Sequence, residues 1–399
     1  MKPPLSLAEA QARLLDGADA LASEQVRTED ALGRHLAEDI VAARTQPAAD
    51  LSAMDGYAMP GGDLAGPWRV IGESAAGHPF AGEPQPGEAV RISTGAPMPA
   101  GTDAVLLQEN ARREGEMLVL NGEGEPTARH VRRRGFDFAA GDKLLPAGTR
   151  MGPAQIALAL AGGCARLAVH ARPSVVVIDS GDELAADPGA CGVHQIPASN
   201  GAMLAAMVTP LAAAVRRVGP VPDRLDALLV ALEQAAEADV IVTSGGASVG
   251  DHDLVRPALD EWGATIDFWR VAMKPGKPLL VARRARQIVL GLPGNPVSSY
   301  VTAFLFLLPL LRKLGGARFP LPRALTLPLG AALPAAGDRT EFLRGRLDGA
   351  AAVPVGGQDS SALGALSHAE LLIERPAGAA PTATGEPAKV YWLADGGTA

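Results

Sequence analysis

The sequence predicts a multidomain α/β protein in which a doubly wound α/β domain is flanked by helical and β-rich regions. Residues 174–178 and 239–243 are almost continuous apolar runs, as expected for strands buried on both faces of a parallel sheet. Helical patterns alternate with these strands along the chain, which is typical of a doubly wound sheet. On either side, stretches rich in glycine and proline contain short strand-like runs, which indicate small β domains.

Composition supports a folded protein with sizeable cores. The chain has 399 residues, of which 47% are hydrophobic, so global disorder is excluded. The 46 glycines and 33 prolines are scattered, which excludes a collagen-like repeat. The net charge of −8 argues against a nucleic-acid partner bound through overall charge.

The sequence carries no targeting or membrane signal that we can recognise. The first ten residues contain one lysine and no apolar core of a signal peptide. The longest apolar stretch, residues 301–311, is too short for the ~20 residues of a membrane helix. Cys164 and Cys191 are isolated. We therefore expect a soluble, cytoplasmic protein with no membrane partner.

The first third of the chain alternates helical and β-rich segments. A capping box at Ser6 and Glu9 predicts a helix through Leu15, and residues 28–35 form a second short helical pattern. Short strand-like runs then follow from residue 47 to about 142. A further helix begins near residue 153 and ends at the glycines 162–163. That helix could belong with the N-terminal ones, which would make the first domain discontinuous.

The α/β pattern begins at about residue 172. Helical patterns cover residues 200–215, 224–236 and 297–314, and a third buried strand covers 288–290. Strand-like runs return at 324–329, 342–347, 371–374 and 388–393. We therefore predict four domains: an N-terminal domain (1–45 and 138–171), an inserted β-rich domain (46–137), an α/β domain (172–318) and a C-terminal β domain (319–399).

Three loops of the predicted α/β domain contain residues suited to binding anions. The densest is the glycine- and serine-rich segment after strand 239–243, where backbone N–H groups can approach a phosphate. The segment 273–278 holds Lys274 and Lys277 in a stiff proline–glycine frame. In the third, residues 292–299, Ser298 lies at a predicted helix start. Alternatively, these are an ordinary glycine-rich turn, a solvated basic turn and a helix cap.

Carboxylates are the other candidate functional groups. Residues 179–184 contain three acidic side chains beside a strand end, and Asp251 and Asp253 end the glycine-rich loop. Such oxygen ligands suit a hard cation. In the β-rich region, Asp55 could be a metal ligand or general base and Thr94 a hydrogen-bond donor, although the residues alone favour turn chemistry and strand-end capping.

The order of these motifs resembles one known family. SAMDGYA, STGAPMP, SGDEL, TSGGASVGDHD, MKPGKP and LPGNPVSS occur in the order and spacing of the MoeA family, the molybdopterin molybdenumtransferases, which includes the C-terminal domain of gephyrin. The resemblance implies an elongated homodimer of four-domain chains with a MoaB/Mog-like α/β domain. It also implies that molybdate is inserted into adenylated molybdopterin with Mg²⁺-dependent release of AMP.

The resemblance also implies roles for individual residues. The implied catalytic residues are Asp55, Thr94, Glu183, Asp253, Lys274 and Lys277. Implied metal ligands are Asp55, Glu183, Asp251 and Asp253. The implied binding residues for the molybdopterin substrate and molybdate are Ser244, Gly245, Gly246, Ser248, Gly250, Arg270, Pro293, Gly294, Asn295, Pro296, Ser298, Arg344 and Ser360.

The chain departs from the family pattern in places. Arg270 stands where a lysine is common, and Asp179 and Ser180 replace the first residues of S-T-G-D-E-L. Asp223 is a stand-in for an acidic residue expected nearby. Two alternatives stay open: a molybdopterin adenylyltransferase, and a gephyrin-like binding scaffold. For the molybdenumtransferase, the adenylyltransferase that makes its substrate is an expected partner.

Overall fold

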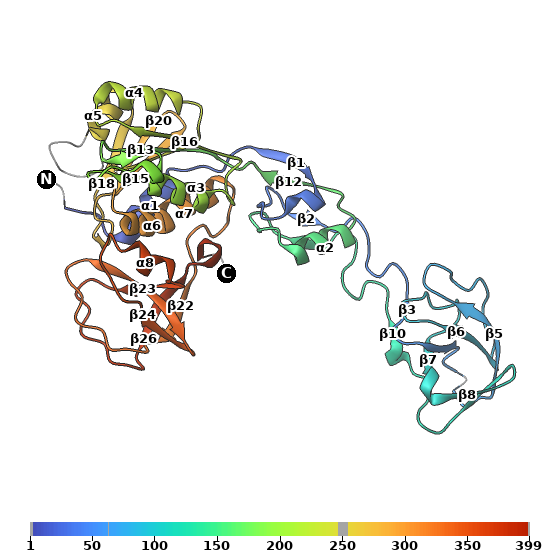
Figure 1. Cartoon of the computed structure of the whole chain (residues 1–399). Coiled ribbons are helices and arrows are strands. Elements are labelled where there is room, and N and C mark those ends of the chain that lie inside the picture. Colours follow the sequence, from blue (N-terminus) through green and yellow to red (C-terminus); the bar gives the residue numbers. More distant parts are fainter. Residues whose placement is uncertain (1–2, 63, 246–253, 398–399) are drawn as a thin grey trace.

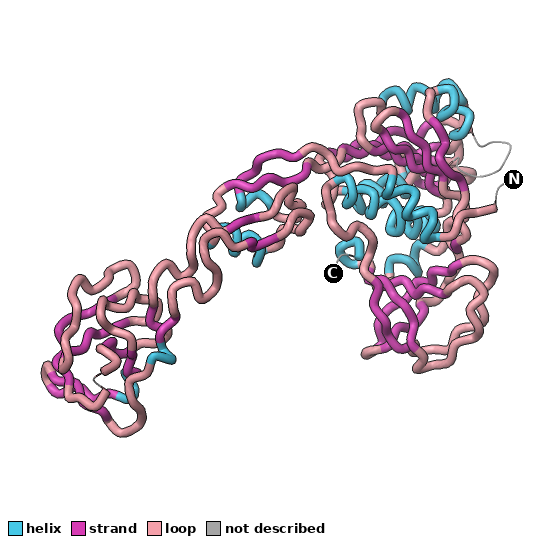
Figure 2. Tube along the Cα trace, turned by 180° about the vertical axis from the view of Figure 1, so that it is seen from behind, coloured by secondary structure: helices cyan, strands magenta, loops and turns pink. Residues whose placement is uncertain are grey.

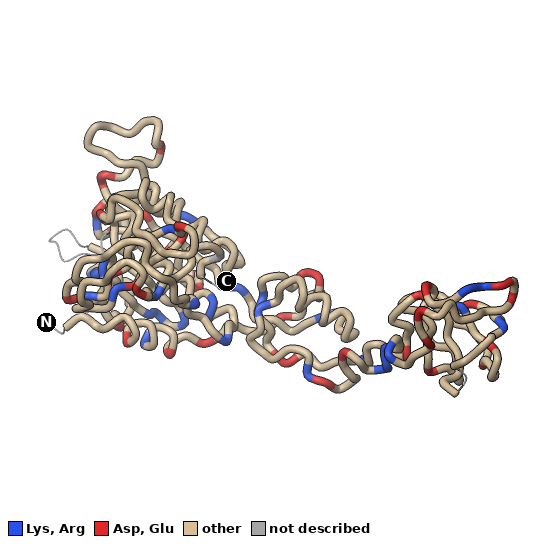
Figure 3. Tube along the Cα trace, turned by 90° about the horizontal axis from the view of Figure 1, so that it is seen from below, with Lys and Arg blue, Asp and Glu red and all other residues tan. Residues whose placement is uncertain are grey.

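The computed structural model describes residues 3–62, 64–245 and 254–397. Figure 1 shows an elongated molecule: a large two-part body at one end, a small sheet domain at the other, and a slender arm between them. The view from behind in Figure 2 shows the same row of parts. Lys and Arg are interspersed with Asp and Glu along the whole length in Figure 3.

The body is organised around a six-stranded sheet with the order β16-β13-β17-β21-β20-β18. β16, β13, β17 and β21 are parallel to one another, and β20 runs antiparallel to both β21 and β18. The doubly wound α/β fold predicted from the sequence is therefore confirmed. The strands are β13 (Ser174–Ser180), β16 (Ala214–Val221), β17 (Val240–Ser244), β18 (Thr265–Trp269), β20 (Leu280–Arg284) and β21 (Gln287–Leu292).

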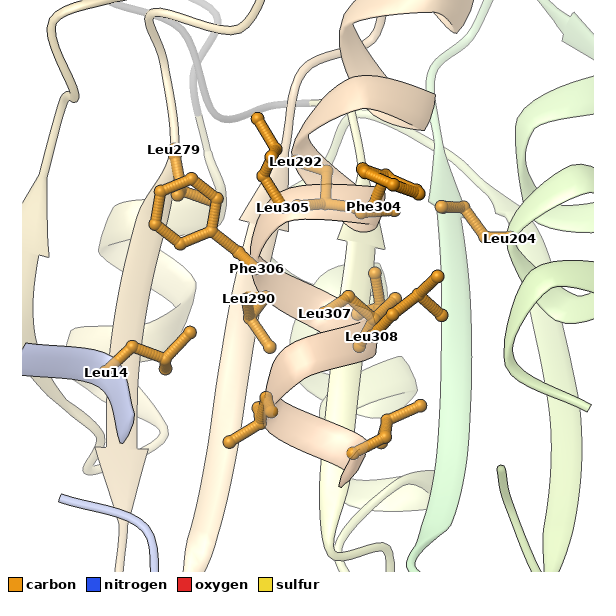
Figure 4. Close-up of a cluster of buried hydrophobic side chains, with 14 of the residues drawn as sticks. Leu14, Leu204, Leu279, Leu290, Leu292, Phe304, Leu305, Phe306, Leu307 and Leu308 are labelled. Atoms are coloured by element: carbon orange, nitrogen blue, oxygen red, sulfur yellow. The ribbon is translucent and has the colours of Figure 1, made fainter. Parts of the chain in front are cut away.

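Alternate residues of the central strands enter two separate cores, because side chains alternate between the faces of a sheet. Val175 and Val242 pack on one face against helices α1, α3, α6 and α7, in the cluster that Figure 4 shows in part. Val176 and Ile241 pack on the other face against α4 and α5. The helices are α1 (Leu7–Asp16), α3 (Ser199–Val208), α4 (Leu225–Gln234), α5 (Val255–Glu261), α6 (Pro296–Thr302) and α7 (Leu308–Leu314).

Helices α6 and α7 are joined by a π-helical turn, η5 (Ala303–Leu307), into one continuous segment. This segment is long and apolar enough to span a membrane, but 89% of its apolar window is buried inside the protein. The segment is therefore the central core helix of the body.

Three elements differ from the sequence-based expectation. The helical pattern predicted over 28–35 is a single 3-10 turn, Thr28–Ala31. The helix predicted over 200–215 ends at Val208, and residues 214–221 form the edge strand β16. Pro210 disfavours a helical continuation, and the sheet edge supplies backbone partners for the next residues. Helix α1, assigned above to the N-terminal domain, packs instead on the body, where Ala10 and Leu14 are fully buried. The capping box of Ser6 and Glu9 is present as predicted.

The arm holds more strand than helix. Two antiparallel strand pairs, β1–β12 and β2–β11, each join a segment before the distal domain to a segment after it. The chain therefore passes through the arm twice. A small core around Leu36, Met151 and Val169 stabilises it. Its elements are β1 (Ser23–Arg27), η1 (Thr28–Ala31), β2 (Ile40–Val41), β11 (Lys143–Leu145), α2 (Pro153–Ala161) and β12 (Arg166–His170).

The distal domain is a sheet with the order β7-β4-β6-β5-β9-β8, and the pair β3–β10 connects it to the arm. Trp68 is fully buried in its core. The elements are β3 (Leu51–Ser52), β4 (Gly56–Met59), β5 (Trp68–Ser74), β6 (Glu88–Ile92), β7 (Ala104–Leu107), η2 (Gln108–Asn110), β8 (Ala111–Glu114), β9 (Met117–Leu120), η3 (Ala128–His130) and β10 (Val131–Arg132).

The C-terminal part of the body is a second sheet, β19-β23-β25-β26-β22, with β24 paired to β23. Strand β19 comes from the α/β domain and joins the edge of this sheet, so the two parts of the body share backbone hydrogen bonds. The elements are β19 (Met273–Lys274), β22 (Ala324–Pro328), β23 (Thr340–Asp348), β24 (Ala351–Pro354), α8 (Leu363–Ser367), β25 (Leu371–Arg375), β26 (Pro387–Trp392) and η6 (Ala394–Gly397).

In the α/β domain, the connection between β13 and α3 contains three short elements: β14 (Leu184–Ala185), η4 (Pro188–Ala190) and β15 (Ile196–Pro197).

Candidate active site

The candidate site lies at the carboxyl edge of the parallel strands, where ligands of open α/β sheets bind. Asp179, Ser244 and Leu292 are register partners at the ends of β13, β17 and β21. Gly245 follows with φ +97°, and its N–H donates to the Leu292 carbonyl over 3.3 Å. A Cβ on Gly245 would lie 2.6 Å from the Ser180 carbonyl, so only glycine allows this exit between two strand ends.

Part of the predicted loop lies outside the described residues: Gly246, Ser248, Gly250, Asp251 and Asp253. Their predicted roles in phosphate and metal binding remain predictions. The described strand end places Ser244 and Gly245 at the start of that segment.

The proline-rich loop before α6 connects three elements of the site. Pro293 is buried, whereas Gly294 and Asn295 are exposed at the strand end. Asn200, at the start of α3, donates to the Gly294 carbonyl over 2.6 Å. Pro296 is the first residue of α6 and is suited to that position because it lacks an N–H. Ser298 follows in the first turn and is 5% exposed.

A loop of the C-terminal sheet closes onto the same helix start. The Asn295 amide donates to Ser360 Oγ over 3.1 Å, and the Val297 N–H donates to the Ser360 carbonyl over 3.1 Å. The structure therefore brings two predicted binding residues, Asn295 and Ser360, into direct contact across two domains.

Arg344 is enclosed rather than open to the site. Its side chain is 0% exposed, and one guanidinium nitrogen donates to the carbonyls of Gly357 (2.6 Å) and Asp359 (3.0 Å). Burial lowers the pKa of Arg344, partly offset by the charge of Asp359. In this arrangement Arg344 fixes the loop that carries Ser360, and direct contact with an oxyanion would require that loop to move.

The two lysines lie on an exposed loop between the two parts of the body. The Lys274 ammonium is 3.2 Å from Glu341 Oε1, on the neighbouring strand β23. Gly276 has φ +106°, and a Cβ there would lie 2.5 Å from Thr302 Cγ2, so the loop packs closely on α6. Lys277 is exposed one residue further on. The loop thus presents cations beside the end of α6, at Thr302.

Arg270 lies just before the lysine loop, at the end of β18. Its guanidinium carbon is 4.1 Å from the centre of the Trp269 ring, within the range of a cation–π contact. Its φ of +88° is uncommon for a residue with a side chain. β18 ends at the same edge as β21, so Arg270 lies along the same edge as the other site residues.

The acidic motif after β13 splits into buried and exposed carboxylates. Asp179 is 1% exposed; its Oδ2 is 3.3 Å from Arg217 Nη2, and its Oδ1 has no hydrogen-bond partner among the described residues. Burial raises the pKa of Asp179, partly offset by Arg217. Glu183 is exposed three residues after the strand ends at Ser180.

Asp223 joins this acidic group from the loop after β16. It accepts hydrogen bonds from the Ser180 hydroxyl (3.1 Å) and the Asp182 N–H (3.4 Å). Its own N–H donates to Asp182 Oδ1 over 3.1 Å. Asp223 therefore belongs to the acidic group beside β13, and its role as a stand-in for the family's acidic residue remains a prediction. Sequence reasoning missed Asn200, since no local pattern marks it. Glu341 begins a segment that resembles the family's, but its contact with Lys274 was not predicted.

Asp55 and Thr94 lie in the distal domain, far along the molecule from the carboxyl edge (Figure 1). The Thr94 N–H donates to Asp55 Oδ1 over 2.7 Å. This bond, with a smaller contribution from Arg91, lowers the pKa of Asp55, so the exposed carboxylate is ionised at neutral pH. A Cβ on Gly56 would lie 2.0 Å from the Leu106 carbonyl, so glycine is required beside Asp55.

The part of one chain that the structure describes does not by itself bring the predicted magnesium ligands together, and the magnesium site remains a prediction. The described residues hold no group of three or more potential metal-ligating side chains. Glu183 has the oxygen chemistry that Mg²⁺ prefers, but Asp55 lies in another domain and Asp251 and Asp253 lie outside the described residues.

Family models match most of the chain. Residues 5–163 match the MoeA N-terminal region (domains I and II), residues 176–313 a probable molybdopterin binding domain, and residues 326–393 the MoeA C-terminal region (domain IV).

Curated relatives and a solved structure agree with these matches. The molybdopterin molybdenumtransferase of Bacillus subtilis is 32% identical over 98% of this chain and 95% of its own. Molybdopterin molybdenumtransferase 2 of Mycobacterium tuberculosis is 35% identical over 91% and 93%. A crystal structure of the molybdopterin biosynthesis moeA protein from Pyrococcus horikoshii OT3 superposes with a TM-score of 0.83 at 27% identity, covering 97% of this chain and 99% of its own. The chain therefore belongs to the MoeA family of molybdopterin molybdenumtransferases.

Proposed function

We propose that this chain inserts molybdate into adenylated molybdopterin and releases AMP at the carboxyl edge of its α/β sheet. Its membership of the molybdopterin molybdenumtransferases makes it an enzyme of molybdenum cofactor biosynthesis. The observation that carries the proposed location is the meeting of two domains at this edge, where Ser360 contacts Asn295 and Lys274 contacts Glu341.

Both substrates are anions, and the edge offers the donors that anions require. Lys274 and Lys277 supply charge, while Ser298 and Ser360 supply hydrogen bonds. Cleavage of the phosphoanhydride forms a bond from a water oxygen to phosphorus and breaks the bridging P–O bond, with AMP as leaving group. The two dithiolene thiols together displace one molybdate oxygen, and their two protons leave with that oxygen as one water molecule.

We propose that the reaction centre is completed by a second copy of the chain. Asp55 and Thr94 lie next to strands β4 and β6 of the distal domain, at the opposite end of the molecule from the two-part body that holds Lys277 and Ser360 (Figure 1). A homodimer would allow the distal domain of one chain to reach the carboxyl edge of its partner. The ionised Asp55 would then act as a base or metal ligand at the phosphoanhydride.

We further propose Mg²⁺ as the divalent ion. Glu183, Asp251 and Asp253 of one chain, with Asp55 of the second, have the donor chemistry to hold it. Such an ion neutralises charge that develops on the leaving phosphate. The proposed setting is cytoplasmic, with neither membrane nor nucleic acid as partner, and the adenylyltransferase that supplies the substrate is the proposed protein partner.

Release of AMP tests this function. Purified protein is incubated with adenylated molybdopterin and Mg²⁺, with and without molybdate, and AMP is measured. We expect AMP release that depends on molybdate. A folded dimer that releases no AMP would contradict the proposal, whereas ATP-dependent adenylation of molybdopterin would support the adenylyltransferase alternative. Retention of a peptide partner without any turnover would support the scaffold alternative.

A further inference from the structure

Arg91 lies beside the Asp55–Thr94 pair of the distal domain and takes no part in the function proposed above. It belongs to strand β6, where it is the register partner of Tyr57 on β4. Thr94 follows two residues after the end of the same strand. One strand therefore carries both Arg91 and the residue whose N–H donates to the Asp55 carboxylate.

The Arg91 guanidinium joins two segments of the chain next to Asp55. Its Nη1 donates to the Gly56 carbonyl over 2.9 Å, and its Nη2 donates to Gln108 Oε1 over 2.7 Å. Its central carbon is 5.4 Å from the centre of the Tyr57 ring, within the range of a cation–π contact. Two charge-assisted hydrogen bonds from a planar group fix its orientation. Arg91 therefore ties the start of β4 to η2.

Gln108 links this guanidinium to the main chain of Asp55. The Gln108 N–H donates to the Asp55 carbonyl over 3.1 Å. In its side chain, Nε2 donates to Glu109 Oε1 over 3.1 Å, and Oε1 accepts the hydrogen bond from Arg91. Gln108 thus holds Asp55 through its backbone and Arg91 through its side chain.

Hydrogen bonds have to orient Asp55, because core packing does not. Asp55 lies in the short connection between β3 and β4, and its side chain is exposed. Its carboxylate accepts from the Thr94 N–H and its carbonyl from the Gln108 N–H. The next carbonyl, that of Gly56, accepts from Arg91. A displacement of a reacting group by about 1 Å can slow a reaction about hundredfold, so contacts that fix this connection affect the rate.

We propose that Arg91 is a positioning residue for Asp55, which it orients by holding the Gly56 carbonyl and the Gln108 side chain. This inference rests on the proposed function, since it says how one of the reacting groups is held in place. Arg91 acts through these two neighbours and does not touch the reacting atoms. A guanidinium suits this task better than an ammonium, because its donors are set in one rigid plane.

A double-mutant cycle tests whether Arg91 acts through Asp55. Arg91→Met removes both hydrogen bonds, so kcat for AMP release should fall about thirtyfold, while KM for adenylated molybdopterin changes less than about twofold. In the Asp55→Asn chain the same substitution should lower kcat less than about twofold, because no carboxylate is left to orient. Arg69→Met, which changes an exposed arginine on the neighbouring strand β5, is the matched control and should leave kcat unchanged.

Milder variants keep the test valid if Arg91→Met folds poorly. Gln108→Ala removes the acceptor for Nη2 but keeps the backbone donor to Asp55, so kcat should fall about fivefold. Gln108→Glu keeps an acceptor there and should restore kcat to near the wild-type value. Arg91→Lys keeps the charge without the planar donors and should recover only part of the loss. A purely structural arginine would lower the unfolding temperature of its variants without this pattern in kcat.

Deuterium exchange provides a readout that does not depend on turnover. The Thr94 N–H is protected by its hydrogen bond to Asp55, so in the full chain it should exchange at least about fivefold faster in Arg91→Met than in the wild type. Arg69→Met should leave this exchange unchanged.

The two readouts separate this inference from the proposed function. Faster Thr94 exchange in Arg91→Met, with no AMP release by the wild-type chain, would contradict the proposed function but support the positioning of Asp55 by Arg91. Unchanged Thr94 exchange would overturn the inference. An equal loss of kcat on adding Arg91→Met to the wild-type and Asp55→Asn chains would also overturn it, because Arg91 would then act independently of Asp55.

Discussion

The distal domain and the carboxyl edge of the α/β sheet hold predicted catalytic residues in two different ways. In the distal domain, Asp55 and Thr94 are fixed by one hydrogen bond of 2.7 Å within a single small sheet. At the carboxyl edge, Asn295 and Ser360 meet from two domains, and Lys274 reaches Glu341 across a shared strand pair. The Asp55–Thr94 pair is complete within the distal domain, whereas the contacts at the carboxyl edge depend on how the two domains of the body pack.

This contrast suggests a division of labour. The Asp55 carboxylate is kept ionised by its hydrogen bond to the Thr94 N–H. It can therefore act as a base or metal ligand at whichever site the distal domain contacts. A rim of cations and hydroxyls from several segments is suited to holding a large anionic substrate. The two regions lie at opposite ends of one chain (Figure 1), which is why we propose that they meet between chains.

The largest effect is expected at Asp55. Asp55→Asn keeps the shape of the side chain but removes its charge, so AMP release should fall at least several hundredfold, about the contribution of a catalytic acid or base. Binding of adenylated molybdopterin should persist. Glu73→Gln, which changes an exposed carboxylate of the same sheet, is the matched control. Turnover of Asp55→Asn near the wild-type rate would remove Asp55 from the chemistry.

At the carboxyl edge, Lys277→Ala should reduce kcat/KM for molybdate about hundredfold, because a hydrogen bond to a charged group contributes roughly 1.5–3 kcal/mol. Lys143→Ala, an exposed lysine of the arm, should have no effect. Steady-state kinetics with varied molybdate provide the measurement. An unchanged KM and kcat for Lys277→Ala would show that the lysine loop does not bind the oxyanion.

The arm between the two regions should be sensitive to acid. Burial, together with Arg150 and Arg312, lowers the pKa of His35 from 6.5 to about 4. Between these values the unfolded chain binds the extra proton, so the free energy of unfolding should fall as pH drops below 6.5 and level off below about 4. At pH 5 this loss is about 2 kcal/mol, roughly a thirtyfold change in the unfolding equilibrium.

Urea unfolding at pH 7 and pH 5 measures this effect. His35→Gln should lose most of the pH dependence, whereas His78→Gln, an exposed histidine of the distal domain, should retain it. Equal pH dependence in wild type and His35→Gln would show that other groups are responsible.

The smallest effect is expected where two domains meet. Asn295→Ala removes the donor to Ser360 Oγ, and one neutral hydrogen bond contributes about 1 kcal/mol, so kcat/KM should fall about fivefold. Asn121→Ala, which removes a side-chain hydrogen bond in the distal domain, is the control. A loss as large as that of Lys277→Ala would show that Asn295 contacts substrate directly.

Much of the fold could be predicted from local patterns. The apolar runs 174–178 and 239–243 are buried on both faces, and such strands have a clear sequence signature. The motifs that follow them lie at one edge because parallel strands end together. By contrast, β16 is an exposed edge strand whose alternation is weak, and the position of α1 depends on distant partners.

The sequence allowed the residues of the candidate site to be predicted, but not the contacts between them. Asn200 and Glu341 are polar residues on ordinary elements, and only tertiary packing places them beside Gly294 and Lys274. The burial of Arg344 is likewise set by the loop of residues 357–360 folding over it, for which the sequence offers no periodic pattern.

Complementation between two inactive variants tests the central claim most directly. Asp55→Ala and Lys277→Ala chains are mixed one to one, exchanged through mild denaturation and assayed for AMP release. If each site combines Asp55 of one chain with Lys277 of the other, half of the dimers are mixed and one of their two sites is intact, so activity should recover to about a quarter of the wild-type value. No recovery, although mixed dimers form, would contradict a site shared between chains.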